Sequence, residues 1–463
     1  MFRVFPSRAS SAAVYEALLD GILGFVALLA AALTLGAIPG GLAGVITDGP
    51  AMATALGFAI VMALFQSFVG VYRHRLTLLP LTLRVSIVVV LAGYGTYLAL
   101  KQFHLHPHPG PLVGMAVAYF LLAIFMLRGA AIALRGVTGV PRVLIVGTGV
   151  EAQGVLDDLR ADDRHMRDVV GFYPTALDTE TLVDGAPLFD RSRQLTDIVT
   201  KYGIDEIVVA VREQRGGVMP MEQLLTCRTR GIKILDLAAF YERSHAEVPV
   251  DSLKASWLVY GEGFVQGPAR RFAKRSFDVL SSALLLLIAS PLMLLAVLAI
   301  KLDSRGPVFY RQQRVGLGGR TFQCVKFRSM RTDAESDGVA RWATKNDSRV
   351  TRVGAIMRKT RIDELPQLFS VLNGEMSIVG PRPERPEFVA KLKDQIPFYD
   401  LRHGVKPGVT GWAQVRYSYG ASVEDARRKH QFDLYYLKNN TLLMDLQILI
   451  ETVTVVLFRE GAQ

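Results

Sequence analysis

The sequence predicts a multidomain membrane protein: an N-terminal bundle of four transmembrane helices, a cytosolic Rossmann-like α/β domain, and a mainly helical C-terminal domain with a re-entrant membrane helix. Half of the 463 residues are hydrophobic, and they gather into long runs. Strand-like and helical patterns alternate in the middle of the chain. A fifth long apolar run is interrupted at its centre. We expect boundaries at 1–135, 136–245, a linker at 246–270, and 271–463.

The N-terminal third contains four apolar runs, each near the roughly 20 residues that span a bilayer. They are Val14–Ile38, Ala51–Tyr72, Leu78–Leu100 and Pro111–Leu134. Arginines precede the first run, bracket the link between the second and third, and follow the fourth. Because basic residues favour the cytoplasmic side, we expect the N-terminus and everything after residue 135 to be cytoplasmic. The first run is too long for a secretory signal peptide, so none is expected.

Three other features do not predict a site. The net charge of +11 is explained by basic segments beside the membrane and an anionic substrate, and no nucleic-acid partner is expected because no recognition helix appears. Cys227 and Cys324 lie far apart in cytosolic segments, which disfavours a structural disulfide. His104, His106 and His108 lie in a Pro-rich loop without a nearby carboxylate, so we expect no metal there.

The α/β segment begins with a predicted buried strand, Arg142–Val146. Gly147-Thr-Gly149 and a helical stretch follow it. Later apolar runs, alternating with helical patterns, indicate a parallel sheet: Val169–Tyr173, Glu206–Val211 and Ile232–Leu235. The glycines allow a phosphate to approach a helix N-terminus. However, no acidic residue closes the second strand, so a structural role is favoured over a bound nucleotide.

The fifth apolar run, Val279–Ile300, predicts a re-entrant helix over 277–301. Ser290 and Pro291 interrupt it, and proline kinks a helix because it removes one backbone donor. Basic residues flank both ends of the run. A bent helix that enters and leaves by the same leaflet keeps both flanks cytoplasmic, whereas a kinked spanning helix would not. The spanning alternative remains open.

Asp363 and Glu364 form an acidic pair within a basic segment, residues 358–383. Asp363 is placed to N-cap a short helix that Gly374 ends, and there it should stay ionised. The simplest interpretation is a capping Asp beside a surface Glu. The surrounding cations change that interpretation, because cations around two acids beside a membrane suit phosphate chemistry. The cations that lead into the pair are Lys326, Arg328, Arg349, Arg352, Arg358 and Arg361.

The C-terminal motifs resemble the bacterial sugar transferase family of polyprenyl-phosphate phosphoglycosyl transferases. The motifs, in order, are KRSFDVLSSALLLLIASP, PVFYRQQRVGLGGRTFQCVKFRSM, DELPQLFSVLNGEMSIVGPRP and KPGVTGWAQV. The N-terminal half is similar to the long form of this family, the undecaprenyl-phosphate glucose or galactose phosphotransferases. The passage after Trp412 looks closer to the exopolysaccharide-locus branch. These enzymes are monotopic and begin exopolysaccharide or O-antigen synthesis.

The resemblance implies an enzyme of the bacterial inner membrane whose catalytic domain faces the cytoplasm. Its substrates would be a UDP-sugar and undecaprenyl phosphate, and its product a polyprenyl-diphosphate-sugar with release of UMP. Asp363 would be the nucleophile, and Glu364 a metal ligand or a support for it, with Mg²⁺ at the pair. Lys326 and Arg382 would hold phosphate oxygens, with Arg328 and Arg361 as second-rank candidates. A homodimer is plausible.

Two other function classes remain as alternatives. One is a non-catalytic membrane scaffold that senses nucleotide through its Rossmann-like domain. The other is a NAD-dependent sugar-modifying enzyme, for which the expected acidic ribose-binding residue is missing. Further along, Trp412 is expected in the core or at the membrane interface, and no catalytic role is expected for His403. Thr441–Phe458 should lie in the interface or pack on the domain, because its acids make a spanning helix costly.

Overall fold

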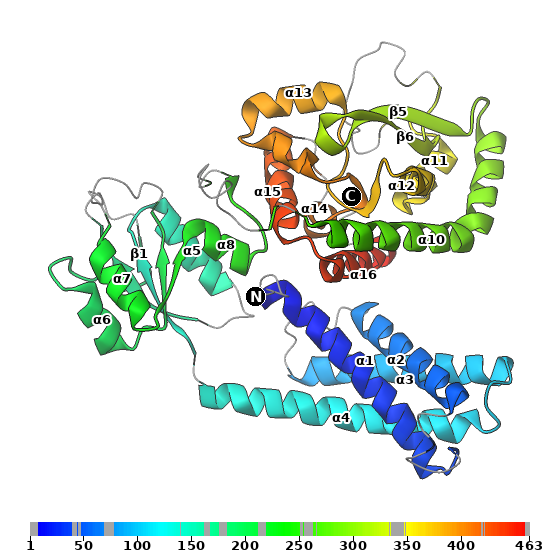
Figure 1. Ribbon diagram of the computed structural model, residues 1–463, viewed down its shortest axis with the longest axis horizontal. Coiled ribbons are helices and arrows are strands. Elements are labelled where there is room, and N and C mark those ends of the chain that lie inside the picture. Colours follow the sequence, from blue (N-terminus) through cyan, green and yellow to red (C-terminus); the bar gives the residue numbers. More distant parts are fainter. Residues whose placement is uncertain are drawn as a thin grey trace. The chain divides into compact units, whose positions relative to one another are not determined.

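The computed structural model of the chain divides into two compact units at Ser244–His245 (Figure 1). The residues that it describes are 8–38, 44, 48–68, 78–138, 140–161, 167–175, 183–211, 219–250, 253, 263–264, 266–332, 334, 347, 349–417, 420 and 422–458. Each unit has hydrophobic cores of its own.

Four long helices occupy the four predicted N-terminal runs. They are α1 (Arg8–Thr34), α2 (Gly49–Phe68), α3 (Leu78–Gln102) and α4 (Pro109–Thr138). Residues of all four helices form one hydrophobic cluster. Gly24 lets α1 approach the backbone of α2, since a Cβ there would lie 3.3 Å from the Ala59 Cα atom. Small residues at such contacts are typical of helices packed inside a membrane.

Three helices in the described part of the chain are long and apolar enough to cross a membrane. They cover Val85–Gln102, Pro109–Leu127 and Pro268–Asp303. The described parts of α1 and α2 contribute shorter apolar stretches, Leu18–Thr34 and Gly49–Ala63. Helices at all four expected places are therefore confirmed, while spanning by all four stays a prediction.

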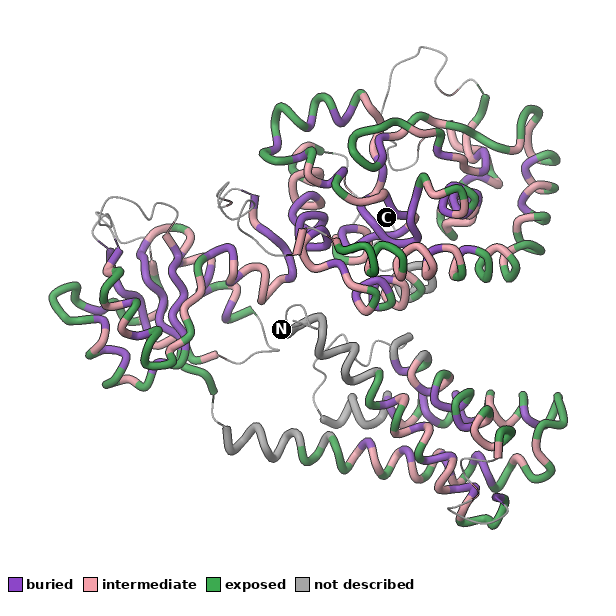
Figure 2. Tube along the Cα trace, viewed as in Figure 1, coloured by how far each residue is buried: buried purple, intermediate pink, exposed green. Residues whose placement is uncertain are grey.

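The predicted parallel sheet is confirmed. Its strands are β1 (Arg142–Val146), β2 (Asp168–Tyr173), β3 (Glu206–Val209) and β4 (Lys233–Asp236), in the order β2-β1-β3-β4. All three neighbouring pairs are parallel. The two central strands, β1 after Arg142 and β3, are buried, as Figure 2 shows, because helices cover both faces of the sheet. The edge strands β2 and β4 are more exposed.

The covering helices are divided between the two faces of the sheet. α5 (Val150–Ala161) and α8 (Leu237–Ser244) pack on the face that carries Val143 and Ile145. α6 (Leu195–Tyr202) and α7 (Met221–Thr229) pack on the opposite face with Leu144. Cys227 lies in this second core, and neither it nor Cys324 forms a disulfide.

The C-terminal unit begins with α10 (Pro268–Asp303), a 36-residue helix with Pro291 inside it. Because proline has no N–H, the Leu287 carbonyl lacks its usual helical donor, and the Ser290 hydroxyl donates to that carbonyl at 2.8 Å. Figure 1 shows the helix bending sharply before it leads to β5. Ser290 and Pro291 therefore lie within one continuous, bent helix.

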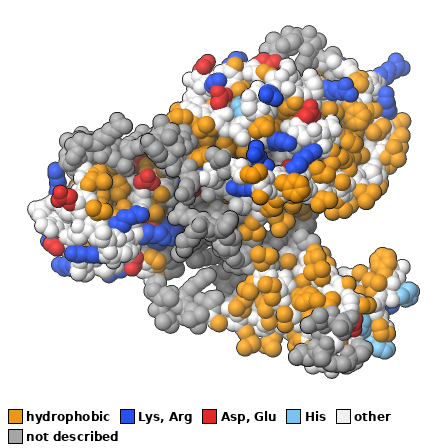
Figure 3. All heavy atoms as spheres, viewed as in Figure 1, with side chains coloured by type: hydrophobic (Ala, Val, Ile, Leu, Met, Phe, Trp, Pro, Cys, Tyr) orange, Lys and Arg blue, Asp and Glu red, His pale blue; other side chains and the backbone are white. Residues whose placement is uncertain are grey.

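The apolar stretch of α10 is mostly exposed, with only 11% of it buried inside the protein. Leu287, Ile288, Leu294 and Leu295 are each more than half exposed. Figure 3 shows hydrophobic side chains spread over the surface of this unit, with Lys and Arg side chains beside them. Such a helix requires a hydrophobic surrounding, which a bilayer supplies.

The elements that follow α10 are shorter than it, and they carry the polar residues discussed below. The strands are β5 (Phe309–Val315), β6 (Thr321–Phe327), β7 (Ser377–Val379) and β8 (Gly408–Thr410). The helices are α11 (Arg352–Lys359), α12 (Gln367–Asn373), α13 (Pro386–Gln395), α14 (Trp412–Arg416), α15 (Val423–Asn439) and α16 (Leu442–Phe458). β5 and β6 form an antiparallel hairpin, and β7 and β8 pair in parallel.

Residues 246–250, which the sequence suggested as linker, pack into the core of the C-terminal unit. Ala246, Val248 and Val250 are buried there. The Trp412 indole donates to the Ala246 carbonyl at 2.8 Å, and the Val248 N–H donates to the Gln431 carbonyl at 3.1 Å. The prediction that Trp412 packs in the core is confirmed.

Gly147→Ala should destabilise the protein, because Gly147 has a φ of +119° and a Cβ would lie 2.9 Å from the Ala210 carbonyl oxygen. Gly231→Ala is the matched control: its φ is +91°, but nothing lies within 4 Å of the new Cβ. We expect losses in the free energy of unfolding of about 3 kcal/mol and about 1 kcal/mol, respectively. Thermal unfolding in detergent measures both, and equal losses would contradict the steric argument.

Candidate active site

The acidic pair lies in a short 3-10 helix, η4 (Ile362–Glu364), between α11 and α12. The predicted N-cap role of Asp363 is wrong, since α12 begins at Gln367 with Pro366 as its cap residue. The turn of η4 separates Asp363 from the first turn of α12. The predicted end of that helix is confirmed, because Gly374 has a φ of +87° and its N–H bonds back to the last turn.

Arg361 immediately precedes η4 and has a φ of +59°. Residues other than glycine adopt this left-handed conformation at a cost in free energy. This backbone conformation turns the chain sharply between α11 and η4. As a result Asp363 and Glu364 are carried into the protein and are only 8% and 6% exposed.

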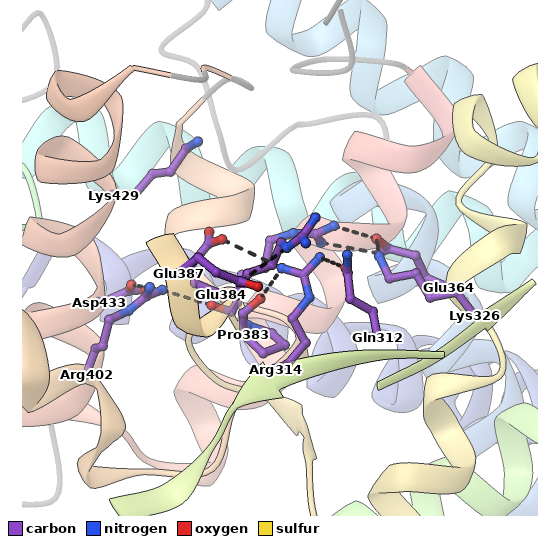
Figure 4. Close-up of polar contacts among 12 residues, drawn as sticks. Gln312, Arg314, Lys326, Glu364, Pro383, Glu384, Glu387, Arg402, Lys429 and Asp433 are labelled. Atoms are coloured by element: carbon purple, nitrogen blue, oxygen red, sulfur yellow. Dashed lines mark hydrogen bonds and ion pairs between the residues drawn. The ribbon is translucent and has the colours of Figure 1, made fainter. Parts of the chain in front are cut away.

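Glu364 is neutralised by cations from three separate segments. The Lys326 ammonium, on β6, donates to Oε1 at 2.9 Å. The Arg382 guanidinium, in the segment between β7 and α13, donates to Oε1 at 2.6 Å and approaches Oε2 at 3.4 Å. Arg361 lies farther away, at 3.8 Å from Oε1. Figure 4 shows Lys326 against Glu364, with dashed contacts converging on its carboxylate.

The two acids therefore have different electrostatic environments. Burial disfavours the charged form of Glu364, but Arg382, Lys326 and Arg361 outweigh burial and hold its pKa well below its usual range. For Asp363, burial and the neighbouring Glu364 charge raise the pKa to about 6, against the same three cations. The sequence predicted that the helix N-terminus and the arginines favour the charged form of Asp363. The structure corrects this, because burial and Glu364 raise the pKa of Asp363 instead.

One oxygen of Asp363 has no partner. Its Oδ1 atom is buried and accepts no hydrogen bond from any residue that the structure describes. Leaving a buried carboxylate oxygen unpaired costs free energy, and such groups are often functional. An unpaired carboxylate oxygen can bind a metal ion or attack an electrophilic phosphorus.

Arg328 is not brought to the acidic pair. Its guanidinium donates to the Arg305 carbonyl at 2.9 Å and to the Ser304 carbonyl at 2.7 Å, at the C-terminal end of α10. Helix ends leave carbonyls without intrahelical donors, and a cation satisfies them well. β6 ends at Phe327, and the chain then turns towards that helix end. Of the four predicted cations, Lys326, Arg382 and Arg361 surround Glu364.

Two arginines near Arg382 were not singled out from the sequence. Arg314, on β5, donates to the Pro383 carbonyl at 3.0 Å. Arg402, in the 3-10 helix η5 (Tyr399–Gly404), donates to the Arg382 carbonyl at 2.9 Å. Arg314 lies within the PVFYRQQRVGLGG motif and Arg402 lies outside the quoted motifs, and neither position indicates its partner. Their partners lie 69 and 20 residues away, so only the folded structure reveals them.

His403 is buried beside Asp400, with Nδ1 3.7 Å from a carboxylate oxygen. Burial, with the adjacent Arg402 charge, lowers the pKa of His403 to about 4. The imidazole is therefore neutral at physiological pH. That His403 has no part in the chemistry stays a prediction.

The cluster fits a magnesium ion at Asp363 better than at Glu364. Mg²⁺ usually binds one or two carboxylates and completes its shell with water and substrate phosphates. Asp363 Oδ1 is unpaired, whereas both oxygens of Glu364 already contact cations. Among the described residues, no three His, Cys, Asp or Glu side chains lie together so that they could hold a metal ion. A bound ion would therefore need phosphate oxygens as further ligands.

Residues 269–459, which contain this whole cluster, match the family described as bacterial sugar transferase. A UDP-glucose:undecaprenyl-phosphate glucose-1-phosphate transferase of Xanthomonas campestris pv. campestris is 32% identical over 364 residues, 76% of this chain and 73% of the relative. The chain belongs to the bacterial sugar transferase family. The similarity to the Xanthomonas relative extends well beyond the family domain.

Other relatives of the family carry different sugars in their names. An undecaprenyl-phosphate galactose phosphotransferase of Salmonella typhimurium is 32% identical over 338 residues, 69% of each chain. A UDP-N-acetylgalactosamine-undecaprenyl-phosphate N-acetylgalactosaminephosphotransferase of Aeromonas hydrophila is 42% identical over 240 residues, 52% of this chain. That alignment spans 56% of the Aeromonas protein's length. Family membership therefore does not select one sugar.

Arg328→Met should lower the free energy of unfolding by about 3 kcal/mol, because two carbonyls at the end of α10 lose a charged donor. Arg361→Met is the comparison, since its more exposed guanidinium stands 3.8 Å from Glu364 and should cost under about 1 kcal/mol. Denaturant unfolding followed by circular dichroism measures both. A larger loss for Arg361→Met would contradict the structural role of Arg328.

Proposed function

We propose that the protein transfers a sugar-1-phosphate from a UDP-sugar to undecaprenyl phosphate, in the cytoplasmic face of a bacterial inner membrane. The observation that carries the proposal is the unpaired Oδ1 atom of Asp363, beside a carboxylate that three cations neutralise. A nucleophile and a cationic site for phosphates lie together in a member of a sugar transferase family.

In the first step, a carboxylate oxygen of Asp363 attacks the phosphorus that bears the sugar. The bond between that phosphorus and the bridging oxygen breaks, and its electron pair leaves with UMP. The product is a sugar-phosphoryl aspartate on the enzyme. A buried carboxylate with a raised pKa suits this attack, because it is less solvated and more basic than an exposed one.

In the second step, a phosphate oxygen of undecaprenyl phosphate attacks the same phosphorus. The acyl phosphate bond breaks, the aspartate leaves with its electron pair, and polyprenyl-diphosphate-sugar forms. Dividing the transfer into two steps avoids holding two anionic substrates at one small site. Among the residues that the structure describes, three cations contact Glu364, and their positive charge suffices for one diphosphate more readily than for two anionic substrates.

Lys326 and Arg382 would stabilise the charge that develops on the transferred phosphate. Glu364 holds both cations by direct ion pairs, which fixes their positions before substrate binds. This favours a supporting role for Glu364 over the metal-ligand role, because its oxygens are already engaged. Mg²⁺ bound at Asp363 would offset charge on the diphosphate.

The membrane helix explains how a lipid phosphate reaches the site. α10 exposes an apolar surface, contains Pro291 and bends along its length (Figure 1). Both of its flanks are basic, so a re-entrant path in the cytoplasmic leaflet satisfies them together. The acidic cluster belongs to the same unit as α10. A polyprenyl chain can then remain in the bilayer while its phosphate meets Asp363.

Asp363→Asn should abolish transfer, because an amide is a poor nucleophile for phosphorus. We expect the rate of UMP release to fall on the order of a thousandfold or more, with normal membrane insertion. The assay measures UMP release from a panel of UDP-sugars with Mg²⁺, with and without undecaprenyl phosphate, and protein-bound sugar phosphate in parallel. Asp394→Asn, at an exposed position of α13, is the control.

Three outcomes decide between the functions. Lipid-dependent turnover with one sugar, and labelled protein without lipid, would support the proposal. Substantial turnover by Asp363→Asn would mean that another residue is the nucleophile. No UMP release by the folded wild-type protein from any sugar would contradict the proposed donor class and favour a scaffold.

The rate of protein labelling should fall with decreasing pH around pH 6. The carboxylate form of Asp363 is the nucleophile, and its pKa is raised to about 6, so protonation removes it below that pH. An unperturbed aspartate would show the same loss near pH 4. Labelling with a radioactive UDP-sugar across pH 4.5–8 tests this, with circular dichroism at each pH as the folding control. A labelling rate that stays constant down to pH 5 would contradict the raised pKa of Asp363 and its buried environment.

A further inference from the structure

The backbone segment that carries Arg382 is held by its carbonyl oxygens. Four consecutive carbonyls each accept a hydrogen bond. The Gly408 N–H donates to Pro381, the Arg402 guanidinium to Arg382, the Arg314 guanidinium to Pro383, and the Val315 N–H to Glu384, at 2.9 to 3.0 Å. The segment is therefore fixed from β5, η5 and the first residue of β8.

The peptide unit between Arg382 and Pro383 can be held by a hydrogen bond to one backbone group alone, its carbonyl. The nitrogen of Pro383 has no hydrogen, so that peptide cannot donate a hydrogen bond. The Arg382 carbonyl is its only polar backbone group, and Arg402 binds it. Removing Arg402 would free the peptide next to the side chain that contacts Glu364 and, in the proposed function, the phosphate.

Arg402 is itself held by a buried acid. Its Nη2 atom contacts Asp433 Oδ2, on α15, at 2.8 Å, and its Nη1 atom donates to the Tyr399 hydroxyl at 2.6 Å. The Arg402 and Asp433 side chains are 6% and 2% exposed. Figure 4 shows the two side chains facing each other on one side of Pro383, while Arg314 reaches Pro383 from β5.

Stabilisation of the fold does not by itself explain the buried ion pair of Arg402 and Asp433. Removing two charges from water costs free energy that their attraction only partly offsets, and well-packed apolar residues often replace buried pairs without loss. An apolar pair would fill the same space, but it could not donate to a carbonyl. The guanidinium reaches the acid and the Arg382 carbonyl together because it presents several donors in a rigid plane.

We propose that Arg402, oriented by Asp433, is a positioning residue that aims the Arg382 guanidinium at Glu364 and at the phosphate of the donor. Arg402 contacts no reacting atom. It acts through the Arg382 carbonyl, and Arg382 then keeps its 2.6 Å contact with Glu364. The catalytic consequence rests on the proposed function, whereas the positioning of Arg382 does not.

The test replaces the pair with apolar residues, Arg402→Met with Asp433→Leu, which removes both charges and the donor together. The matched control is Arg416→Met with Glu451→Leu, an ion pair at 3.2 Å that touches none of the four carbonyls. We measure the thermal midpoint, kcat and KM for UMP release, and the rate at which phenylglyoxal modifies Arg382, by peptide mass spectrometry.

We expect the Arg402/Asp433 variant to keep a thermal midpoint close to that of the wild type. Its kcat/KM should fall about a hundredfold, the loss typical of a misplaced catalytic group. Arg382 should be modified several-fold faster, because it no longer stays against Glu364. The control pair should change neither the kinetics nor the modification of Arg382. A stable variant with wild-type kinetics and wild-type modification of Arg382 would overturn the proposal.

Two further outcomes are also decisive. If the wild-type protein releases no UMP, the proposed function fails, and the modification rate of Arg382 alone decides whether Arg402 positions it. If the double variant does not fold, Arg402→Lys replaces it. Lysine keeps the charge beside Asp433 but lacks the planar set of donors. Wild-type modification of Arg382 in a folded Arg402→Lys protein would overturn the proposal.

Discussion

The arrangement of the residues around Asp363 and Glu364 depends on one interaction. Lys326 and Arg382 neutralise the buried Glu364 carboxylate. A buried acid without cations would lose its charge or destabilise the fold. Lys326 from β6 and Arg382 from the segment after β7 supply the closest cations, so β6, η4 and that segment must meet at Glu364. Once they meet, Asp363 lies beside a charged acid in a buried place, and both conditions raise its pKa.

The same unit connects its membrane helix to this cluster through a second polar contact set. Asp278, near the start of α10, accepts hydrogen bonds from the Lys274 ammonium, the Ser377 hydroxyl and the Ile378 N–H. Lys274 also reaches the Val379 carbonyl, at the end of β7. β7 leads directly to the segment that carries Arg382. The position of α10 is therefore tied to the position of the Arg382 side chain.

Local patterns in the sequence predicted local structure well. Apolar runs located α1 to α4 and the four parallel strands, because burial on both faces of a sheet requires continuous apolar residues. Spacing could not show that Arg328 turns to the end of α10 or that Arg402 reaches the Arg382 carbonyl, because those choices depend on partners far along the chain. Likewise, the raised pKa of Asp363 follows from burial, which a hydrophilic segment does not reveal.

The cluster also limits where sugar selection can reside. In the proposed function, Lys326, Arg382 and Asp363 would recognise phosphate charge and phosphorus, which every nucleoside diphosphate sugar presents in the same form. Relatives named for glucose, galactose and N-acetylgalactosamine all match this chain. Discrimination between such sugars requires hydrogen bonds to individual hydroxyls or an acetamido group. Cations fixed by Glu364 cannot provide it, so the residues that choose the sugar must lie outside the ion-paired cluster.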